Sequence, residues 1–184
     1  MASSLRAVSD QGTMPDAAIK PSPKTAPPAA LIPDIAGNIR DPRLRRFYGY
    51  WLGKRGARRM PARRDIDPLD FPYVLGNLML IDVLRDPLRF RVRLHGSNVV
   101  TRMHYDMTGR LLDEVPRPEW RAYILERCRG LAATGEPLLL LNDLILDDAS
   151  SRYEALWLPF SDDGVNVTLL VCAMIYGELA TVTP

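Results

Sequence analysis

Five short segments in the second half of the chain combine apolar patterning with flanking turn residues, and together they predict a β-sheet. The segments are Asn77–Leu84, Arg89–His95, Leu138–Leu146, Arg152–Phe160 and Val167–Tyr176. The second alternates cleanly, so Phe90, Val92 and Leu94 are expected to be buried while its three arginines and His95 face water. The last is apolar at nearly every position, which is typical of a central strand covered on both faces.

Turn signals predict that the last three of these strands are antiparallel neighbours. Asp147–Ser150 separates the third strand from the fourth, and Asp162–Gly164 separates the fourth from the fifth. Aspartate and glycine favour tight turns because they bond locally or accept a positive φ. The third, fourth and fifth strands should therefore form two consecutive hairpins.

An aromatic stripe predicts an amphipathic helix ahead of the sheet. Asp41 is a suitable N-cap and Pro42 a suitable first helical residue, and Gly53 and Gly56 are expected to end the helix. Its apolar residues recur at helical spacing, at Leu44, Phe47, Tyr48, Trp51 and Leu52. The stripe must pack on something, and two alternatives remain open: the chain's own domain, or a second copy, for which Phe47, Tyr48 and Trp51 would form the partner or dimer surface.

Two further helices are expected between the second and third strands. A short one begins near Gly96-Ser97 and carries Val99, Val100 and Met103. A long one follows Pro116 and Pro118, and its apolar face holds Trp120, Tyr123, Ile124, Cys128 and Leu131. Gly135 is suited to the left-handed conformation that closes a helix.

These patterns divide the chain into three parts. Residues 1–38 are rich in Pro, Ala, Ser and Lys and predict a disordered tail. Residues 39–76 hold the aromatic helix and a proline-containing linker, with short helical turns expected at Asp67–Leu69 and Phe71–Leu75. Residues 77–179 form the sheet-containing domain.

The order and spacing of several short motifs resemble a family of PAS domains common in alphaproteobacteria, most of whose members are short proteins of unknown function. The motifs are Tyr50-Trp51, Arg55-Gly56, Met60-Pro61, Asp65–Pro68, Leu78–Asp82, Phe90–Leu94, Thr108–Arg110 and Leu158–Gly164. The resemblance covers roughly Arg43 to Glu178. It implies an α+β fold with a five-stranded antiparallel sheet of order 2-1-5-4-3, helices over one face and the amphipathic helix at the N-terminus. It also implies a sensor or interaction module without fixed catalytic residues.

Length and composition limit the possible classes of protein. The chain has 184 residues, of which 47% are hydrophobic, and this suits one domain with one core. It contains no apolar run long enough to span a membrane, and its first residues lack the apolar core of a secretory signal. Cys128 and Cys172 lie in apolar patterns without metal-binding spacing, so we expect buried thiols, no metal site and a cytoplasmic location. Cys128 also lacks the Asn-Cys-Arg run of light-sensing PAS domains.

Positive charge is concentrated next to the aromatic helix. Residues 40–64 carry a net charge of +9 within a chain whose total is +2. This allows an alternative function, an adaptor that binds an anionic partner such as nucleic acid or lipid through Lys54–Arg64, with contacts from Arg58, Arg59, Arg63 and Arg64. No DNA-binding motif accompanies the charge, so nucleic acid is not favoured.

The candidate ligand site is inferred from polar or aromatic residues in apolar surroundings. Asn142 and Asp143 interrupt an otherwise apolar strand, and whichever points inward would need a partner, which a ligand, a backbone group or water could supply. The predicted ligand contacts are Asn142, Met103, Tyr105 and Trp157. Haem bound through His104 is a remote alternative. No catalytic motif is recognisable, so we expect a non-enzymatic sensor that binds a small molecule or a signalling protein and signals to another chain. It can form a homodimer. An enzyme is the third hypothesis, after the sensor and the anion-binding adaptor.

Overall fold

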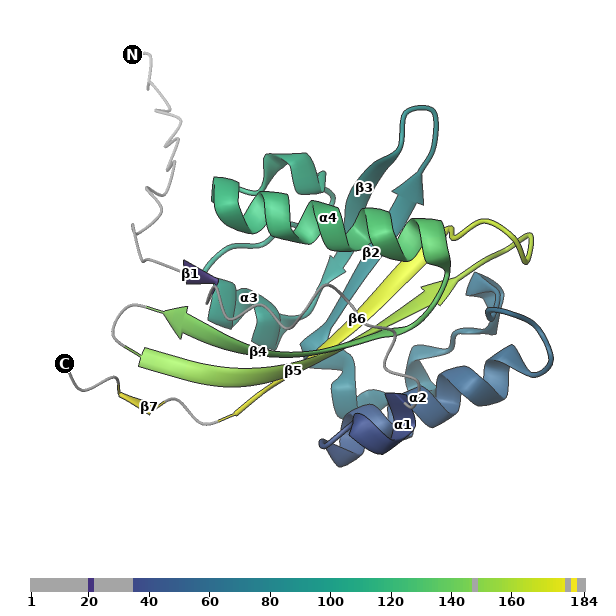
Figure 1. Ribbon diagram of the computed structural model, residues 1–184, viewed down its shortest axis with the longest axis horizontal. Coiled ribbons are helices and arrows are strands. Elements are labelled where there is room, and N and C mark those ends of the chain that lie inside the picture. The colour runs from purple at the N-terminus through teal and green to yellow at the C-terminus, as the bar shows by residue number, and fades with distance from the viewer. Residues whose placement is uncertain (1–19, 22–34, 147–148, 178–179, 182–184) are drawn as a thin grey trace, which may run out of the picture.

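The computed structural model describes residues 20–21, 35–146, 149–177 and 180–181, with side chains over 35–141 and 153–177. The helices are α1 (Ile35–Asn38), α2 (Pro42–Arg55), α3 (Ser97–Met103) and α4 (Pro118–Thr134). The main strands are β2 (Leu78–Leu84), β3 (Arg89–His95), β4 (Leu138–Leu146), β5 (Ala149–Phe160) and β6 (Leu169–Tyr176). Two-residue strands β1 (Lys20–Pro21) and β7 (Ala180–Thr181) pair with β4 and β5. Figure 1 shows the arrangement.

The sheet has the predicted topology. Its strands follow the order β1-β4-β5-β6-β2-β3, and every pairing is antiparallel, so the five main strands confirm the order 2-1-5-4-3. The strand β6 lies between β5 and β2, and seven of its eight residues are buried, as expected for a central strand. The strand β5 begins at Ala149, earlier than predicted, and Asp147 and Asp148 of the expected turn lie outside the described residues.

Helices cover both faces of this sheet. The helices α3 and α4 lie over one face, and α2 lies with three short 3-10 helices (Arg63–Asp65, Pro68–Asp70 and Pro72–Asn77) on the other, as Figure 1 shows. Strand register separates the faces: Trp157 pairs with Cys172 on the α3–α4 side, and Leu158 pairs with Val171 on the α2 side. The helices expected over one face are thus α3 and α4, and the N-terminal helix supplies the opposite layer.

The helix α2 packs on the chain's own sheet. Asp41 caps it by accepting from the Arg43 amide, and its buried residues are Leu44, Phe47 and Trp51. The Trp51 indole Nε1 donates to the Pro159 carbonyl of β5 at 2.9 Å. The interpretation of the stripe as a dimer surface is therefore corrected for Phe47 and Trp51, which are 2% and 1% exposed within one chain. A second copy could reach these rings only if α2 left the sheet.

A buried carboxylate fixes the start of α2. Glu154 of β5 is 7% exposed and accepts from the Arg40 and Asp41 amides at 2.9 and 3.0 Å. These amides precede the first helical turn and have no partner within the helix. The helix continues through Gly53 to Arg55, with Gly56 as its cap, so Gly53 does not end it as predicted.

Residues 60–76 contribute to the core and do not form a free linker. Met60, Ala62, Phe71 and Val74 are each buried, and the Phe71 ring lies 5.1 Å from that of Phe47 in α2. The two expected helical turns are confirmed as the 3-10 helices Pro68–Asp70 and Pro72–Asn77. Most of the predicted tail, residues 1–38, lies outside the described residues, although Lys20–Pro21 pairs with β4 and Ile35–Asn38 forms α1.

A β-bulge reverses the predicted alternation at the end of β3. The pairing of β2 with β3 shifts between Leu80 and Ile81, leaving Arg93 as the extra residue opposite them. Because side chains alternate with a period of two, one inserted residue exchanges the faces beyond it. Phe90 and Val92 are buried as predicted, but Leu94 is 40% exposed and the His95 side chain is 3% exposed.

Candidate functional site: a methionine-rich chamber

A small cavity lies between the sheet and the α3–α4 layer. Every main strand contributes to its floor, through Met79, His95, Leu140, Trp157 and Met174 among others. The helical layer and its connections supply the roof, which includes Met103, Tyr105, Met107, Trp120 and Tyr123. We call this space the chamber. Its volume is about 30 Å³, which is room for about two water molecules.

Flexible and aromatic side chains fill most of the chamber. Four methionines line it, at Met79, Met103, Met107 and Met174. Methionine has three rotatable bonds and a polarizable sulfur, so these side chains can move aside for a ligand at a lower cost than branched residues. Trp120 and Tyr123 stack on the roof at 5.2 Å between ring centroids. The chamber is therefore nearly closed and adaptable in shape.

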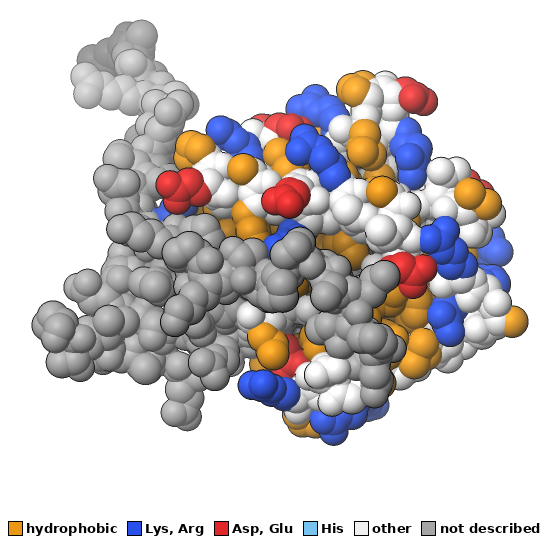
Figure 2. All heavy atoms as spheres, in the orientation of Figure 1, with side chains coloured by type: hydrophobic (Ala, Val, Ile, Leu, Met, Phe, Trp, Pro, Cys, Tyr) orange, Lys and Arg blue, Asp and Glu red, His pale blue; other side chains and the backbone are white. Residues whose placement is uncertain are grey.

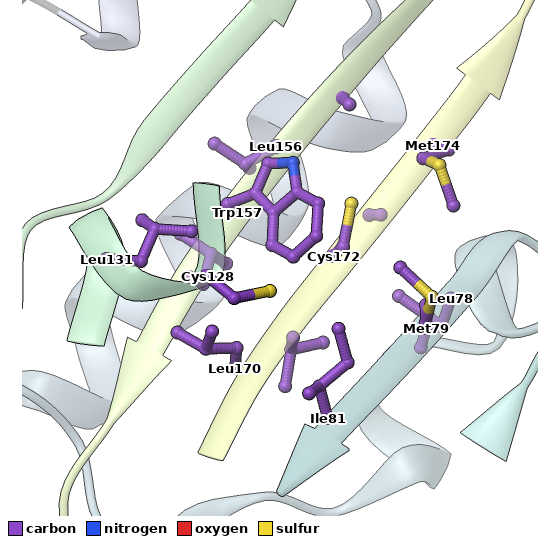
Figure 3. Packing of buried hydrophobic residues seen from close by; sticks show 14 of the residues in the cluster. Leu78, Met79, Ile81, Cys128, Leu131, Leu156, Trp157, Leu170, Cys172 and Met174 are labelled. Atoms are coloured by element: carbon purple, nitrogen blue, oxygen red, sulfur yellow. The ribbon is translucent and has the colours of Figure 1, made fainter. Parts of the chain in front are cut away.

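Within the described part of the chain, two polar atoms of the lining lack a hydrogen-bond partner. They are the Trp157 indole Nε1 and the Tyr123 hydroxyl, and both are buried. Trp157 is 3% exposed, and Figure 3 shows its indole on the same side of the sheet as Cys172 and Met174, facing the side of α4 that carries Cys128. A buried donor without a partner is unfavourable by about 1–3 kcal/mol. Unpaired groups of this kind point to a missing water or ligand.

His95 is a buried part of the chamber, which corrects the expectation that it faces water. Its Nδ1 accepts from the Met107 amide at 3.2 Å, so the neutral ring carries its proton on Nε2. Burial lowers the pKa of His95 below its ordinary value of 6.5, and Asp106, 3.7 Å from Nδ1, opposes this effect. The bulge in β3 is the physical reason for the error, because it rotates His95 to the inner face.

Three of the four predicted ligand residues meet in the chamber. Met103, Tyr105 and Trp157 come from α3, the segment after it, and β5. The Asn142 side chain lies outside the described residues, but its backbone pairs in register with Tyr153, which lines the chamber. That these residues contact a ligand stays a prediction. Burial raises the pKa of Tyr105 to about 12, so its hydroxyl remains a donor at neutral pH.

His104 does not line the chamber. It caps α3 in the left-handed conformation, with φ of 61°, and is exposed. An axial ligand must point toward a bound haem, so haem coordination through His104 does not fit this geometry. Among the described residues, no cluster of three or more His, Cys, Asp or Glu side chains is placed to bind a metal ion.

Sequence reasoning missed several members of the chamber. Met79 and Met174 occupy alternate positions on strands that are apolar on both faces, so periodicity does not say which face is hollow. The predicted apolar face of the long helix includes Trp120 and Tyr123, but whether they line the chamber depends on how α4 crosses the sheet. His95 could have been found only with knowledge of the bulge.

Both cysteines are inert neighbours of the chamber. Cys128 and Cys172 are free and 0% exposed, and burial raises the pKa of both thiols. A raised pKa lowers the fraction of the reactive thiolate. The interpretation of Cys128 as a small buried hydrophobe fits this environment.

Most of the cations in the alternative anion-binding segment already have acidic partners. Arg58 contacts Asp65 at 2.7 Å, Arg63 contacts Asp82 at 3.3 Å, and Arg59 lies 3.6 Å from Glu136. Arg64 is exposed. Figure 2 likewise shows basic and acidic side chains interspersed on the face in view. These pairings reduce the charge available to an anionic partner. Separately, no helix among the described residues is both long and apolar enough to cross a membrane.

A five-stranded antiparallel sheet of this order, with a small chamber beneath a helical layer, defines a PAS-type domain. A family model described as "PAS domain" matches residues 39–174. The chain belongs to this family, and the match includes α2 and residues 60–76 as well as the sheet.

Solved structures of light-oxygen-voltage (LOV) domains are similar to this chain. One, from work on a flavin analogue and the light-oxygen-voltage domain mechanism, has a TM-score of 0.44 at 15% identity and covers 60% of this chain and 83% of that chain. Another, the light state of the blue-light photoreceptor Aureochrome1 LOV, has a TM-score of 0.41 at 16% identity and covers 58% of this chain and 84% of that chain. A search of curated proteins gave no match.

Proposed function

We propose that this PAS domain is a non-enzymatic sensor that binds a small molecule in the chamber and passes the signal to another protein in the cytoplasm. The ligand has an apolar body and at least one hydrogen-bond acceptor. The observation that carries the proposal is the pair of buried, unpartnered donors, Trp157 Nε1 and the Tyr123 hydroxyl, in one methionine-rich lining. An apolar pocket with a few convergent polar groups is the usual form of a ligand site.

The signal would travel as a change in the population of two arrangements of the helical layer. The chamber holds only about 30 Å³ of free space, so a molecule larger than two waters must displace methionine side chains or lift α4 from the sheet. Met103 belongs to α3, and Tyr123 belongs to α4, so both helices sense occupancy directly. A partner that binds the outer side of this layer would detect the change.

Native mass spectrometry combined with an absorption spectrum of freshly purified protein tests the proposal. The expected result is a bound compound of defined mass, lost on denaturation. The variant Trp157→Phe keeps the ring and removes the donor, and it should bind the compound at least tenfold more weakly. Trp51→Phe is a matched control, because it makes the same chemical change on the opposite face of the sheet.

Two outcomes would contradict the proposal. One is a protein that carries no compound and whose chamber resonances do not move when a diverse fragment set is screened by NMR. The other is a bound compound that Trp157→Phe and Trp51→Phe retain equally, since the compound would then lie elsewhere.

A further inference from the structure

A second hollow, separate from the chamber, lies where α2, α3 and the end of β6 meet. Its volume is about 290 Å³, close to the lower end of the range for small-molecule sites. Arg43, Asn77, Asn98, Thr101, Arg102 and Tyr176 line it, and none of its described lining residues is acidic. The hollow is therefore polar and cationic, in contrast to the chamber.

Close backbone packing beside this hollow positions some of its lining residues. Gly96 caps the start of α3 and donates from its amide to the Leu78 carbonyl at 2.8 Å. A Cβ atom on Gly96 would lie 2.5 Å from the Gly76 carbonyl oxygen, so only glycine allows this contact. The contact brings Asn98 beside Asn77, with 3.3 Å between the amide nitrogen and oxygen. The position of Arg102, one turn further along α3, is set by the same contact.

Among the described residues, Arg102 has no carboxylate partner. Its guanidinium carbon lies 5.2 Å from the centroid of the Tyr176 ring, and its Nη1 is buried with no hydrogen-bond partner. Stacking on a ring leaves the in-plane N–H groups of a guanidinium free for a planar or tetrahedral oxyanion. An unpaired, partly desolvated cation is unfavourable unless an anion approaches it.

Arg43 also lines the hollow, although the Asp41 carboxylate balances much of its charge. It belongs to α2 and bonds Asp41 through Nε and Nη2, at 3.1 and 2.9 Å, which leaves Nη1 outside this pair. The side-chain amides of Asn77 and Asn98 line the same hollow. One guanidinium without a carboxylate partner, with the free Nη1 of a second and polar amides in the same concave space, is suited to one carboxylate or phosphate group.

We infer that this hollow binds a small oxyanion, a carboxylate or phosphate group of a soluble metabolite, with Arg102 as the principal contact and Arg43 as the second. The inference does not depend on a ligand in the chamber. The two sites are nevertheless neighbours, because Tyr176 lies beneath Arg102 and its ring is 5.7 Å from that of Tyr153 in the chamber lining.

The test uses the full chain, with inorganic phosphate and succinate as probes and chloride at equal ionic strength as the blank. Phosphate or succinate at millimolar concentration should raise the melting temperature and shift the amide resonances of α3 and the end of β6. Arg102→Gln should weaken binding by roughly tenfold to a hundredfold. Without an oxyanion, Arg102→Gln should be at least as stable as the parent, because it removes an unpaired cation.

Arg129→Gln is the matched control, since Arg129 is exposed on α4 and away from the hollow. It should bind both probes as the parent does. Failure of both probes to bind at 10 mM, or equal loss in the two variants, would overturn the inference. Binding that Arg102→Gln retains would also overturn it, because the probe would then occupy an adventitious surface site only.

Discussion

The two faces of the sheet bury equally large aromatic residues but differ in how their polar atoms are satisfied. On the α2 face, the Trp51 indole donates to Pro159, the Tyr50 hydroxyl donates to Asp65, and Glu154 accepts two amides. On the α3–α4 face, the Trp157 indole and the Tyr123 hydroxyl have no partner. The polar groups of the first face are bonded within the fold, whereas two buried donors of the second face are left for the ligand proposed above.

The α2 face of the sheet has a cavity of its own. The α2 face contains a larger cavity, about 70 Å³, lined by apolar and aromatic side chains that include Phe71, Leu80 and Leu94. None of the unpartnered buried atoms belongs to its lining. Apolar cavities of this kind remain dry and reflect imperfect packing. The described lining of this cavity therefore offers no unpartnered polar group to orient a ligand, in contrast to the chamber.

The largest expected effect tests whether the α2 face is structural. Val171 of β6 is 2% exposed on this face, so Val171→Asp would bury an unpaired carboxylate and should unfold the domain, at a cost of roughly 4 kcal/mol or more. Circular dichroism and thermal melting measure this. Val165→Asp is the control, because Val165 is 70% exposed and the same substitution should leave the melting temperature nearly unchanged. A folded Val171→Asp protein would show that β6 is not the central strand.

The next largest effect concerns the bonded tryptophan. Trp51→Phe removes the donor that reaches the Pro159 carbonyl and leaves this acceptor without it, so stability should fall by about 1–3 kcal/mol. Urea unfolding followed by far-UV circular dichroism gives the change in free energy. If Trp51→Phe proved as stable as the parent, the hydrogen bond would not explain why α2 stays on the sheet.

A smaller effect depends on pH and comes from His95. Because burial lowers its pKa below 6.5, the unfolded chain binds the proton more tightly, and stability should fall as pH drops through 6.5 toward the folded pKa. The slope from this one group is at most about 1.4 kcal/mol per pH unit. His95→Asn should flatten the dependence of melting temperature on pH between 7.5 and 5.5.

His104→Asn is the control for that measurement, because His104 is exposed at the end of α3. It should keep the dependence on pH seen in the parent. Identical pH profiles for the parent and His95→Asn would mean that His95 is not held neutral in the chamber.

The smallest expected effect completes the comparison of the two faces. Trp157→Phe removes an indole N–H that has no partner among the described residues, so the ligand-free protein should lose only the contacts of the larger ring, about 1 kcal/mol, and less than Trp51→Phe loses. The same urea series used for Trp51→Phe measures it. A loss as large as that of Trp51→Phe would show that Trp157 has a structural partner, and it would remove the main support for the proposed ligand.

The sequence by itself determined the elements and their order, because the signals for these are local. Asp41 and Pro42 favour a helix start through their own capping preferences, and Gly135 ends a helix with a φ of 64°. The apolar run of β6 must be covered on both faces of the sheet. Sheet order followed from the motifs that resemble the family. Three of the four proposed ligand residues also met in one place, since apolar faces of adjacent elements must pack together.

Only the tertiary structure decided which polar groups find partners. The bulge opposite Leu80 and Ile81 depends on how two strands pair, and it alone turns His95 to the chamber face and Leu94 to the α2 face. Whether α2 packs on its own sheet depends on Pro159 and Glu154, more than a hundred residues away. Nothing in the local sequence separates Trp51, which is bonded, from Trp157, which is not, because the difference lies in which backbone oxygen the fold brings within reach.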